Sequence, residues 1–402
     1  MKNRSALWFI LATLFLDAIG IGIVFPIMPD LMAKVGAGST ADGAFWGGIL
    51  MASYAAMQFL FAPIIGGLSD SYGRRPVLLL ALVTLTIDYV VMALATTFWW
   101  LLIGRVLAGI AGATYITATA YLSDISKPEE RAANFGLIGA AFGIGFVIGP
   151  AIGGVVASWH ITAPFWLAAA MSGLNVLFGI FVLPESLSPE KRRRFARRDL
   201  NPFGAILDAF RLPGLGLPLM LIFLFEFANM VYPTLWAFWT REVFGWGTAL
   251  IGLTLAAYGV GITFTQGVVM RFLIPRLGEY KTLIFSTGCA LVAFIVFGLT
   301  ASVYVMFSFL IVAALADMAP PTMTAMMANM VAEDRQGLLQ GVIASLGSIA
   351  AVLAPMVMTG MFQFFAAEDA IIYLPGAPFL FSGIILAVIF PLFLRMKPAG
   401  TP

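Results

Sequence analysis

The sequence predicts an all-α membrane protein in which twelve transmembrane helices form two pseudo-symmetric bundles of six. Three observations support this prediction. Of the 402 residues, 61% are hydrophobic and only 10% are charged, whereas soluble domains carry roughly 25% charged residues. Apolar stretches long enough to cross a bilayer follow one another along nearly the whole chain. One long basic segment divides these stretches into two halves.

The predicted spans come from windows of about 20 apolar residues, the length that a helix needs to cross the hydrocarbon core. The first follows Lys2 and Arg4, is longer than the apolar core of a signal peptide and has no small-x-small cleavage site behind it, so we expect it to be retained. The spans are expected at residues 7–29, 44–68, 76–97, 98–123, 134–157, 163–183, 214–238, 247–273, 280–300, 302–331, 337–365 and 375–395.

The basic residues predict the orientation of the spans. Most of the 22 Lys and Arg residues lie at the termini or after even-numbered spans, whereas Lys34 and Arg241 lie in the other connections. Because cytoplasmic loops carry an excess of Lys and Arg, we expect both termini to be cytoplasmic. The longest polar stretch, 184–213, is the expected cytoplasmic linker between an N-terminal bundle (1–183) and a C-terminal bundle (214–402).

This linker contains a basic run from Lys191 to Arg198. Such a run can bind anionic lipid headgroups. A solvated segment that only sets the topology explains the same residues, and we favour that interpretation.

Five ionisable residues lie inside the predicted spans: Asp17, Asp88, Arg105, Glu226 and Asp317. Each costs on the order of 2.5–3.5 kcal/mol at the centre of a bilayer, and such residues usually mark a transport or proton pathway. We therefore expect a water-accessible cavity in which the carboxylates exchange protons. Static ion pairs of Asp17 or Asp88 with Arg105, which only tie helices together, are the alternative.

The second half combines its two carboxylates with aromatic side chains. Asp317 precedes Pro320 and Pro321, so we expect its helix to be broken near the middle of the membrane. The aromatic rings could stack on a flat hydrophobic ligand, and packing in the core or against lipid explains them equally well. The candidate substrate-binding residues are Glu226, Tyr232, Trp236, Tyr258, Gln266 and Asp317.

The two halves contain similar motifs at corresponding positions. An acidic-acidic-Arg motif at 129–131 precedes a Gly-rich span with Pro150, and another at 333–335 precedes a Gly/Ala-rich span with Pro355. A duplicated bundle with a site between its halves is a known plan of membrane transporters.

Other functional classes lack their signatures. The chain has no phosphate-binding Gly-Lys-Ser/Thr loop, so ATP is not expected as an energy source. With one cysteine, Cys289, and one histidine, His160, no metal or nucleophile cluster is expected, and we predict neither an enzyme nor a cofactor. We expect a monomer that interacts with a small molecule, protons and the lipid bilayer, and not with nucleic acid.

A motif between spans 2 and 3 resembles the signature of the major facilitator superfamily. The motif consists of Gly66, Gly67, Leu68, Ser69, Asp70, Ser71, Tyr72, Gly73, Arg74, Arg75 and Pro76. The resemblance implies a cytoplasmic gating cluster of Gly66, Asp70, Gly73, Arg74 and Arg75, joined by Asp124 at the end of span 4. Ser71 departs from the pattern, because the family often has Arg there.

Span 5 carries Gly145, Gly149, Pro150, Gly153 and Gly154. Glycines four residues apart leave one helix face smooth, so that another backbone can approach it closely. Ordinary packing between helices by small residues is the alternative explanation of these glycines. The pattern looks like the antiporter signature of drug/proton exporters in the superfamily, and this resemblance favours export over uptake.

Three further stretches are similar to the tetracycline/proton antiporter family: 16–29 in span 1, 87–89 in span 3 and 104–125 in span 4. The resemblance covers nearly the whole chain. It implies a proton-driven exporter of the bacterial inner membrane in which Asp17, Asp88 and Arg105 line the transport path.

The second half departs from this family. Residues 286–291 lack the acidic residue of span 9, and residues 261–266 lack the histidine of span 8. Glu226 and Asp317 therefore indicate a different substrate or coupling site. Because a fold does not determine the direction of transport, a proton-coupled importer or facilitator of a metabolite is the main alternative. A receptor or scaffold that transports nothing ranks last.

Overall fold

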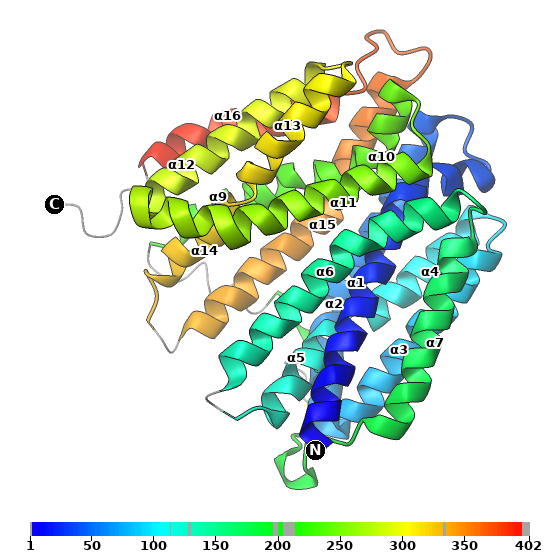
Figure 1. The fold of residues 1–402 in the computed structure, drawn as a ribbon, viewed down its shortest axis with the longest axis vertical. Coiled ribbons are helices and arrows are strands. Elements are labelled where there is room, and N and C mark those ends of the chain that lie inside the picture. Colours follow the sequence, from blue (N-terminus) through cyan, green and yellow to red (C-terminus); the bar gives the residue numbers. More distant parts are fainter. Residues whose placement is uncertain are drawn as a thin grey trace. The chain divides into compact units, whose positions relative to one another are not determined.

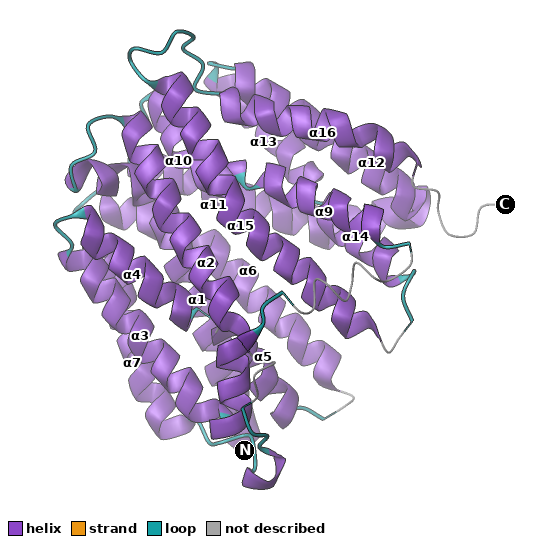
Figure 2. Ribbon diagram, turned by 180° about the vertical axis from the view of Figure 1, so that it is seen from behind, coloured by secondary structure: helices purple, strands orange, loops and turns teal. Residues whose placement is uncertain are grey.

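The computed structural model describes residues 2–112, 114–127, 130–195, 200–203, 214–332 and 335–395. Throughout these ranges the regular elements are helices (Figure 2). The chain folds into two compact units. Unit 1 comprises Met1–Gly36, Ser53–Pro202 and Gly247–Ala256, and unit 2 comprises Ala37–Ala52, Phe203–Trp246 and Ala257–Pro402.

The helices follow the predicted spans closely (Figure 1). Unit 1 contains α1 (Lys2–Lys34), α3 (Arg74–Leu94), α4 (Phe98–Ala111), α5 (Thr114–Ile125), α6 (Arg131–Ala157), α7 (Ala163–Val182) and the 3₁₀ turn η2 (Pro189–Lys191). Unit 2 contains α9 (Gly216–Asn229), α10 (Val231–Phe244), the π-helical turn η4 (Thr265–Val269), α12 (Met270–Leu299), α13 (Val303–Ala316), α14 (Ala319–Ala328), α15 (Gln336–Ala366) and α16 (Ala377–Arg395). Two helices contribute to both units, α2 (Thr40–Tyr72) and α11 (Thr248–Phe264).

Among the described residues, eleven helical segments are long and apolar enough to cross a membrane. The longest, Thr248–Leu299, has 52 residues. A straight helix of that many residues would be about 78 Å long at 1.5 Å per residue, whereas the hydrocarbon core is roughly 30 Å thick. Gly278, with φ at 76°, interrupts its helical geometry. This segment therefore supplies two crossings, and the prediction of twelve is confirmed.

Three spans consist of two shorter helices. The first helix of each pair ends just before Gly112 (α4), Met230 (α9) and Asp317 (α13), and the second helix of the pair begins shortly after. The break predicted at Asp317 is thus confirmed. It follows from the prolines that begin α14, because a proline fits the first turn of a helix and not its interior.

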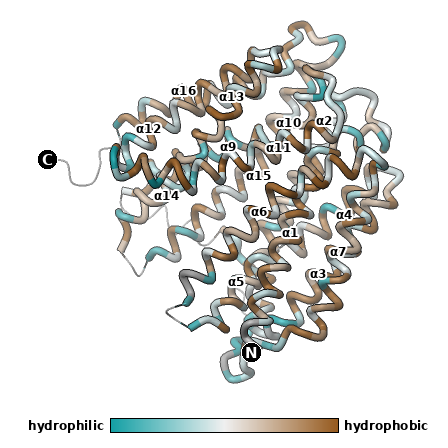
Figure 3. Tube along the Cα trace, viewed as in Figure 1, coloured by the Kyte–Doolittle hydropathy of each residue, from teal (hydrophilic) through white to brown (hydrophobic). Residues whose placement is uncertain are grey.

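Hydrophobic residues recur along the length of the helices (Figure 3). In unit 1 a core joins α1, α3, α5 and α6 and extends to the chain beyond α7. Its buried members are Ala6, Phe9, Ile10, Leu11, Leu14, Leu78, Leu82, Ala118, Tyr121, Leu122, Ile138 and Leu183. This core holds α1 and α3, the helices that carry Asp17 and Asp88.

The units exchange two short segments that the sequence did not predict. Residues 37–52 at the start of α2 pack in unit 2, where a Cβ on Gly48 would lie 3.0 Å from the Cβ of Thr359 on α15. Residues 247–256 at the start of α11 pack in unit 1. The chain changes from unit 1 to unit 2 at Pro202, inside the expected linker. The division into bundles 1–183 and 214–402 remains a prediction.

Candidate functional site

Asp88 and Arg105 form a buried ion pair in unit 1. Arg105 donates from Nη2 to Asp88 Oδ2. Asp88 is fully buried, and the Arg105 guanidinium lies over the Tyr54 ring, 5.7 Å from its centroid. Gly104 makes room for the carboxylate, since a Cβ there would meet Asp88 Oδ1. Within the described residues, Asp88 Oδ1 and Arg105 Nε have no partner, so the pair can bind a further polar group.

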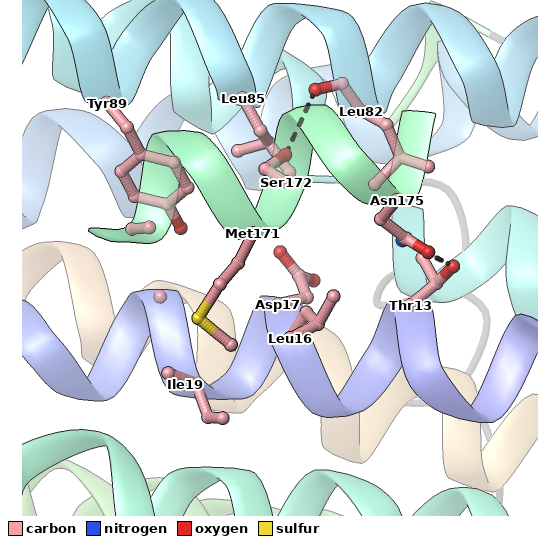
Figure 4. A pocket seen from close by; sticks show the side chains of 12 residues that line it. Thr13, Leu16, Asp17, Ile19, Leu82, Leu85, Tyr89, Met171, Ser172 and Asn175 are labelled. Atoms are coloured by element: carbon pink, nitrogen blue, oxygen red, sulfur yellow. Dashed lines mark hydrogen bonds between the residues drawn. The ribbon is translucent and has the colours of Figure 1, made fainter. Parts of the chain in front are cut away.

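Asp17 on α1 is not part of this pair. It is 7% exposed and makes no hydrogen bond or ion pair to the residues that the structure describes. Its carboxylate faces a pocket between α1, α3 and α7 (Figure 4). The ion-pair alternative therefore applies to Asp88 and not to Asp17.

Asp317 accepts two side-chain hydrogen bonds at the break between α13 and α14. The hydroxyl of Tyr258 donates to Oδ2, and Asn229 Nδ2 donates to Oδ1 over 3.2 Å. Gln266 Nε2 donates to the Asp317 backbone oxygen over 3.1 Å. Glu226 is half-buried and lies three residues before Asn229, on the same face of α9. The structure thus groups four of the predicted substrate residues with Asn229.

The other two predicted substrate residues lie in an aromatic core. Tyr232 is 4% exposed and Trp236 is 2% exposed. The Tyr232 ring stacks on Phe294 with centroids 5.4 Å apart, and Trp236 packs edge-on against Phe297 at 5.6 Å. Tyr232 also contacts Tyr258, whose ring centroid is 5.3 Å away. In this conformation the core covers both rings, so their contact with a ligand remains a prediction.

Three of the predicted gating residues, Asp70, Arg74 and Asp124, meet where α2 and α5 end and α3 begins. Arg74 pairs with Asp70 one turn earlier, and its Nε lies 3.2 Å from Asp124 Oδ2. Gly73, between the two helices, has φ at 108°, a conformation that favours glycine. Arg75 turns away from the cluster, because its Nη2 donates to the Ile180 carbonyl over 2.8 Å.

The segment after α7 completes this cluster. Arg193 Nε donates to Asp70 Oδ2 over 2.8 Å and supplies a second guanidinium next to Ser71, the position where the family often has Arg. Glu185 Oε1 accepts from the Arg74 backbone N over 2.8 Å and so caps the start of α3. Glu185 and Arg193 therefore attach the first part of the linker to the ends of α2 and α3, while most of its described residues are exposed, and the interpretation as a solvated linker remains a prediction. The last two basic residues of the run, Arg197 and Arg198, lie outside the described residues.

The glycines of α6 let two other helices approach closely. A Cβ on Gly149 would lie 2.7 Å from the Ile19 carbonyl oxygen of α1, and one on Gly153 would lie 2.6 Å from that of Ile23. On another face, a Cβ on Gly154 would lie 3.0 Å from the Cα of Gly252 in α11. The close backbone approach predicted from the spacing is thus present, with Gly145 and Pro150 in the same contacts.

Several residues of these sites were not predicted from the sequence. Asn229 had a usable signal, because it lies one helical turn after Glu226. Asn175, which lines the pocket that Asp17 faces, is a rare amide in a largely apolar span. Glu185 and Arg193 had no local signal, since their partners lie 111 and 123 positions away.

A sequence profile of the Major Facilitator Superfamily matches residues 10–355 and 219–402. The chain belongs to the Major Facilitator Superfamily. The tetracycline resistance protein of class C from Escherichia coli is 36% identical over 362 residues, which cover 90% of this chain and 91% of that protein. Multidrug resistance protein 2 of Bacillus subtilis (strain 168) is 28% identical over 96% of this chain and 94% of that protein. The resemblance to the tetracycline-resistance branch of the superfamily is therefore confirmed.

Solved structures of the superfamily share the fold. The human organic anion transporter MFSD10 (TETRAN) has a TM-score of 0.71 at 24% identity and covers 97% of this chain and 99% of its own. A bacterial homolog of the human lysosomal transporter Spinster, in an inward-facing and unoccupied conformation, has a TM-score of 0.80 at 17% identity, covering 100% and 99%. The protein is thus a multi-pass membrane transporter of this superfamily that acts on small molecules.

Proposed function

We propose that the protein is a proton-coupled exporter that moves small amphipathic, drug-like molecules by alternating access. The observation that supports this proposal is the presence of carboxylates inside membrane spans of both units, three of them (Asp17, Glu226 and Asp317) without an ion pair among the described residues. Relatives bear the names of tetracycline and multidrug resistance proteins, which suggests drugs as cargo. The proposal includes no enzymatic step.

Protons supply the driving force in this proposal. A proton that enters down a membrane potential of about 100 mV carries roughly 2.3 kcal/mol. Asp17, Asp88, Glu226 and Asp317 are the candidate proton carriers, with Arg105 competing for Asp88. A carboxylate buried in apolar surroundings changes its protonation when access or a ligand changes, so each can couple proton release to binding.

Substrate binding is assigned to the second half. Glu226, Tyr258, Gln266 and Asp317 would provide polar contacts, and Tyr232 and Trp236 would extend the apolar surface. No described basic residue pairs with Glu226 or Asp317, so this site suits a cationic or hydrogen-bond-donating compound.

The remaining roles follow the same proposal. Residues 1–183 and 214–402 would move as two bundles, while the cluster of Asp70, Arg74 and Asp124 controls the cytoplasmic side. Gly145, Gly149, Pro150, Gly153 and Gly154 would hold α6 against its neighbours during the movement. We place the protein in the bacterial inner membrane as a monomer with both termini in the cytoplasm.

Inside-out vesicles with an imposed pH gradient test the function. Tetracycline and the fluorescent cation ethidium serve as probes. Wild-type protein should accumulate at least one of them when the lumen is acidic, and collapse of the gradient should release it. Asp88→Asn and Glu226→Gln should abolish the gradient-driven part, whereas Glu368→Gln, an exposed acid outside the spans, should not. Undiminished drive in both site variants would contradict the proposal.

A further inference from the structure

A small pocket lies inside unit 1, and neither Asp88 nor Arg105 is among the residues that line it. Its wall is formed by α1, α3 and α7, and it has room for a water molecule (Figure 4). Most of the lining is apolar. The polar members are Thr13 and Asp17 of α1, Tyr89 of α3, and Ser172 and Asn175 of α7.

Asp17 is the buried group that needs a partner here. It is 7% exposed, and no described protein group donates to it or pairs with it. Its carboxylate points from α1 toward α7, between Met171 and Asn175 (Figure 4). A buried polar group without a hydrogen-bond partner destabilises the folded state, and a charged one does so more strongly. A water molecule in the pocket would satisfy it.

The neighbouring polar groups can hold that water. Asn175 Nδ2 donates to Thr13 Oγ1 over 2.9 Å, which leaves the amide oxygen and the Thr13 hydroxyl hydrogen for other partners. Thr13 and Asp17 lie four residues apart on α1 and therefore on one face. The water would donate to Asp17 and to the Asn175 amide oxygen and accept from Thr13. Three partners are typical of a buried water.

Among the described residues, no cation forms an ion pair with Asp17. The pocket wall from α7 carries no titratable residue, and α3 contributes Tyr89, whose hydroxyl lies over Gly20. Of the other helices packed on α1, α6 has a single charged residue, Arg131 at its start, and α5 has Tyr115, Tyr121 and Asp124.

Two further groups lie near the pocket. Tyr54 of α2 is engaged under Arg105, and Arg105 is itself bound to Asp88. The charge of Asp17 is therefore controlled by solvation.

We propose that this pocket is a hydrated proton-binding site in which Asp17 is the proton acceptor and Asn175 and Thr13 are positioning residues that hold its water. The proton passes from a hydronium ion to a carboxylate oxygen of Asp17 and leaves one water molecule. Only O–H bonds form and break. The role of this site in transport rests on the proposed proton-coupled function. Proton binding to Asp17 can nevertheless be tested without a substrate.

Infrared difference spectroscopy between pH 9 and pH 5 on the full chain in lipid nanodiscs is the test. Asp17→Asn should remove one carboxylic C=O band. Asn175→Leu and Thr13→Val should move that band to higher frequency, because an acid that loses its hydrogen-bonded water has a stronger C=O bond. Thr86→Val is the matched control, since its hydroxyl bonds to Ser172 and Leu82 and does not line the pocket.

Each outcome decides one proposal. The pocket assignment is overturned if no band disappears in Asp17→Asn, or if the band keeps its wild-type frequency in both Asn175→Leu and Thr13→Val. Ethidium transport in vesicles from the same preparations tests the proposed function separately. Gradient-driven transport without an Asp17 band would contradict the pocket alone, and a shifted band without transport would contradict the function alone.

Discussion

Arg193 and Asp70 are joined by a hydrogen bond of 2.8 Å between Nε and Oδ2, although 123 positions separate them in the chain. Arg193 also donates its backbone N–H to the Asp70 carbonyl oxygen over 3.2 Å. Two bonds to one residue fix the segment after α7 to the end of α2. The contact places a linker residue in the same cluster as Arg74, where a movement of the linker would change the charge around Asp70.

Replacing Arg193 should loosen this contact without unfolding unit 1. The Asp70–Arg193 pair is about one-third exposed, so we expect Arg193→Gln to cost no more than about 1 kcal/mol. Hydrogen exchange should become faster in peptides that contain Asp70 or residues 185–193. The exposed neighbour Arg194 provides the control, Arg194→Gln. Equal exchange in the two variants would show that Arg193 does not hold the linker.

The Asp88–Arg105 pair should show strong non-additivity. Asp88→Asn leaves the buried Arg105 charge uncompensated, and breaking a buried pair costs about 3–5 kcal/mol. The double variant Asp88→Asn/Arg105→Gln should recover much of that loss, because both charges are removed. Thermal unfolding in detergent of the two single variants and the double variant measures the coupling. Costs that simply add would mean that the two residues do not interact.

The glycine contacts between α6 and α1 should tolerate no side chain. A Cβ on Gly149 would lie 2.7 Å from the Ile19 carbonyl oxygen, so Gly149→Ala must push the helices apart and should cost about 1–3 kcal/mol. Gly143→Ala, on the same helix with open space around it, should be neutral or slightly stabilising. The melting temperatures of the two variants provide the comparison. Similar values would argue against a packing role for the stripe.

Tyr258 should matter for the Asp317 site through its hydroxyl alone. Tyr258→Phe keeps the ring contact with Tyr232 and removes one of the two donors to the Asp317 carboxylate. We expect a loss of stability of about 1–3 kcal/mol, since a buried acceptor then loses its partner, together with altered ethidium binding measured by fluorescence. Tyr304→Phe, at an 86% exposed position, is the control. A Tyr258→Phe variant indistinguishable from Tyr304→Phe would remove Tyr258 from the site.

Tyr373 lies between α15 and α16 and should impose a pH dependence on stability. The pKa of Tyr373 is raised from 10.0 to about 12, mainly because the side chain is partly buried. The hydrogen bond that its hydroxyl donates to Glu242 Oε1 over 2.7 Å raises the pKa further. The folded state thus holds this proton more tightly than the unfolded state, so the stabilisation is complete below pH 10 and is lost as the pH rises through 12. The difference in melting temperature between wild type and Tyr373→Phe should shrink over that range. A constant difference would contradict the assignment.

The sequence alone determined the architecture and the position of the charges. Apolar length sets where a helix can cross a bilayer, so the spans were predictable, including the two crossings separated at Gly278. Local spacing also identified neighbours within one or two turns, such as Asp70 and Arg74, and the glycine face of α6. These relationships depend on the geometry of a single helix, which the residue order specifies.

Only the tertiary structure decided which groups meet across helices. In the sequence, Asp17 and Asp88 are both single carboxylates inside an apolar span. In the structure Arg105 binds Asp88, whereas Asp17 faces a pocket beside Asn175. Likewise, the capping of α3 by Glu185 joins residues more than a hundred positions apart. Spacing along a helix gives the direction of a side chain within that helix alone. Its partner depends on how several helices pack together, and that arrangement decides which buried charge is neutralised and which one needs water.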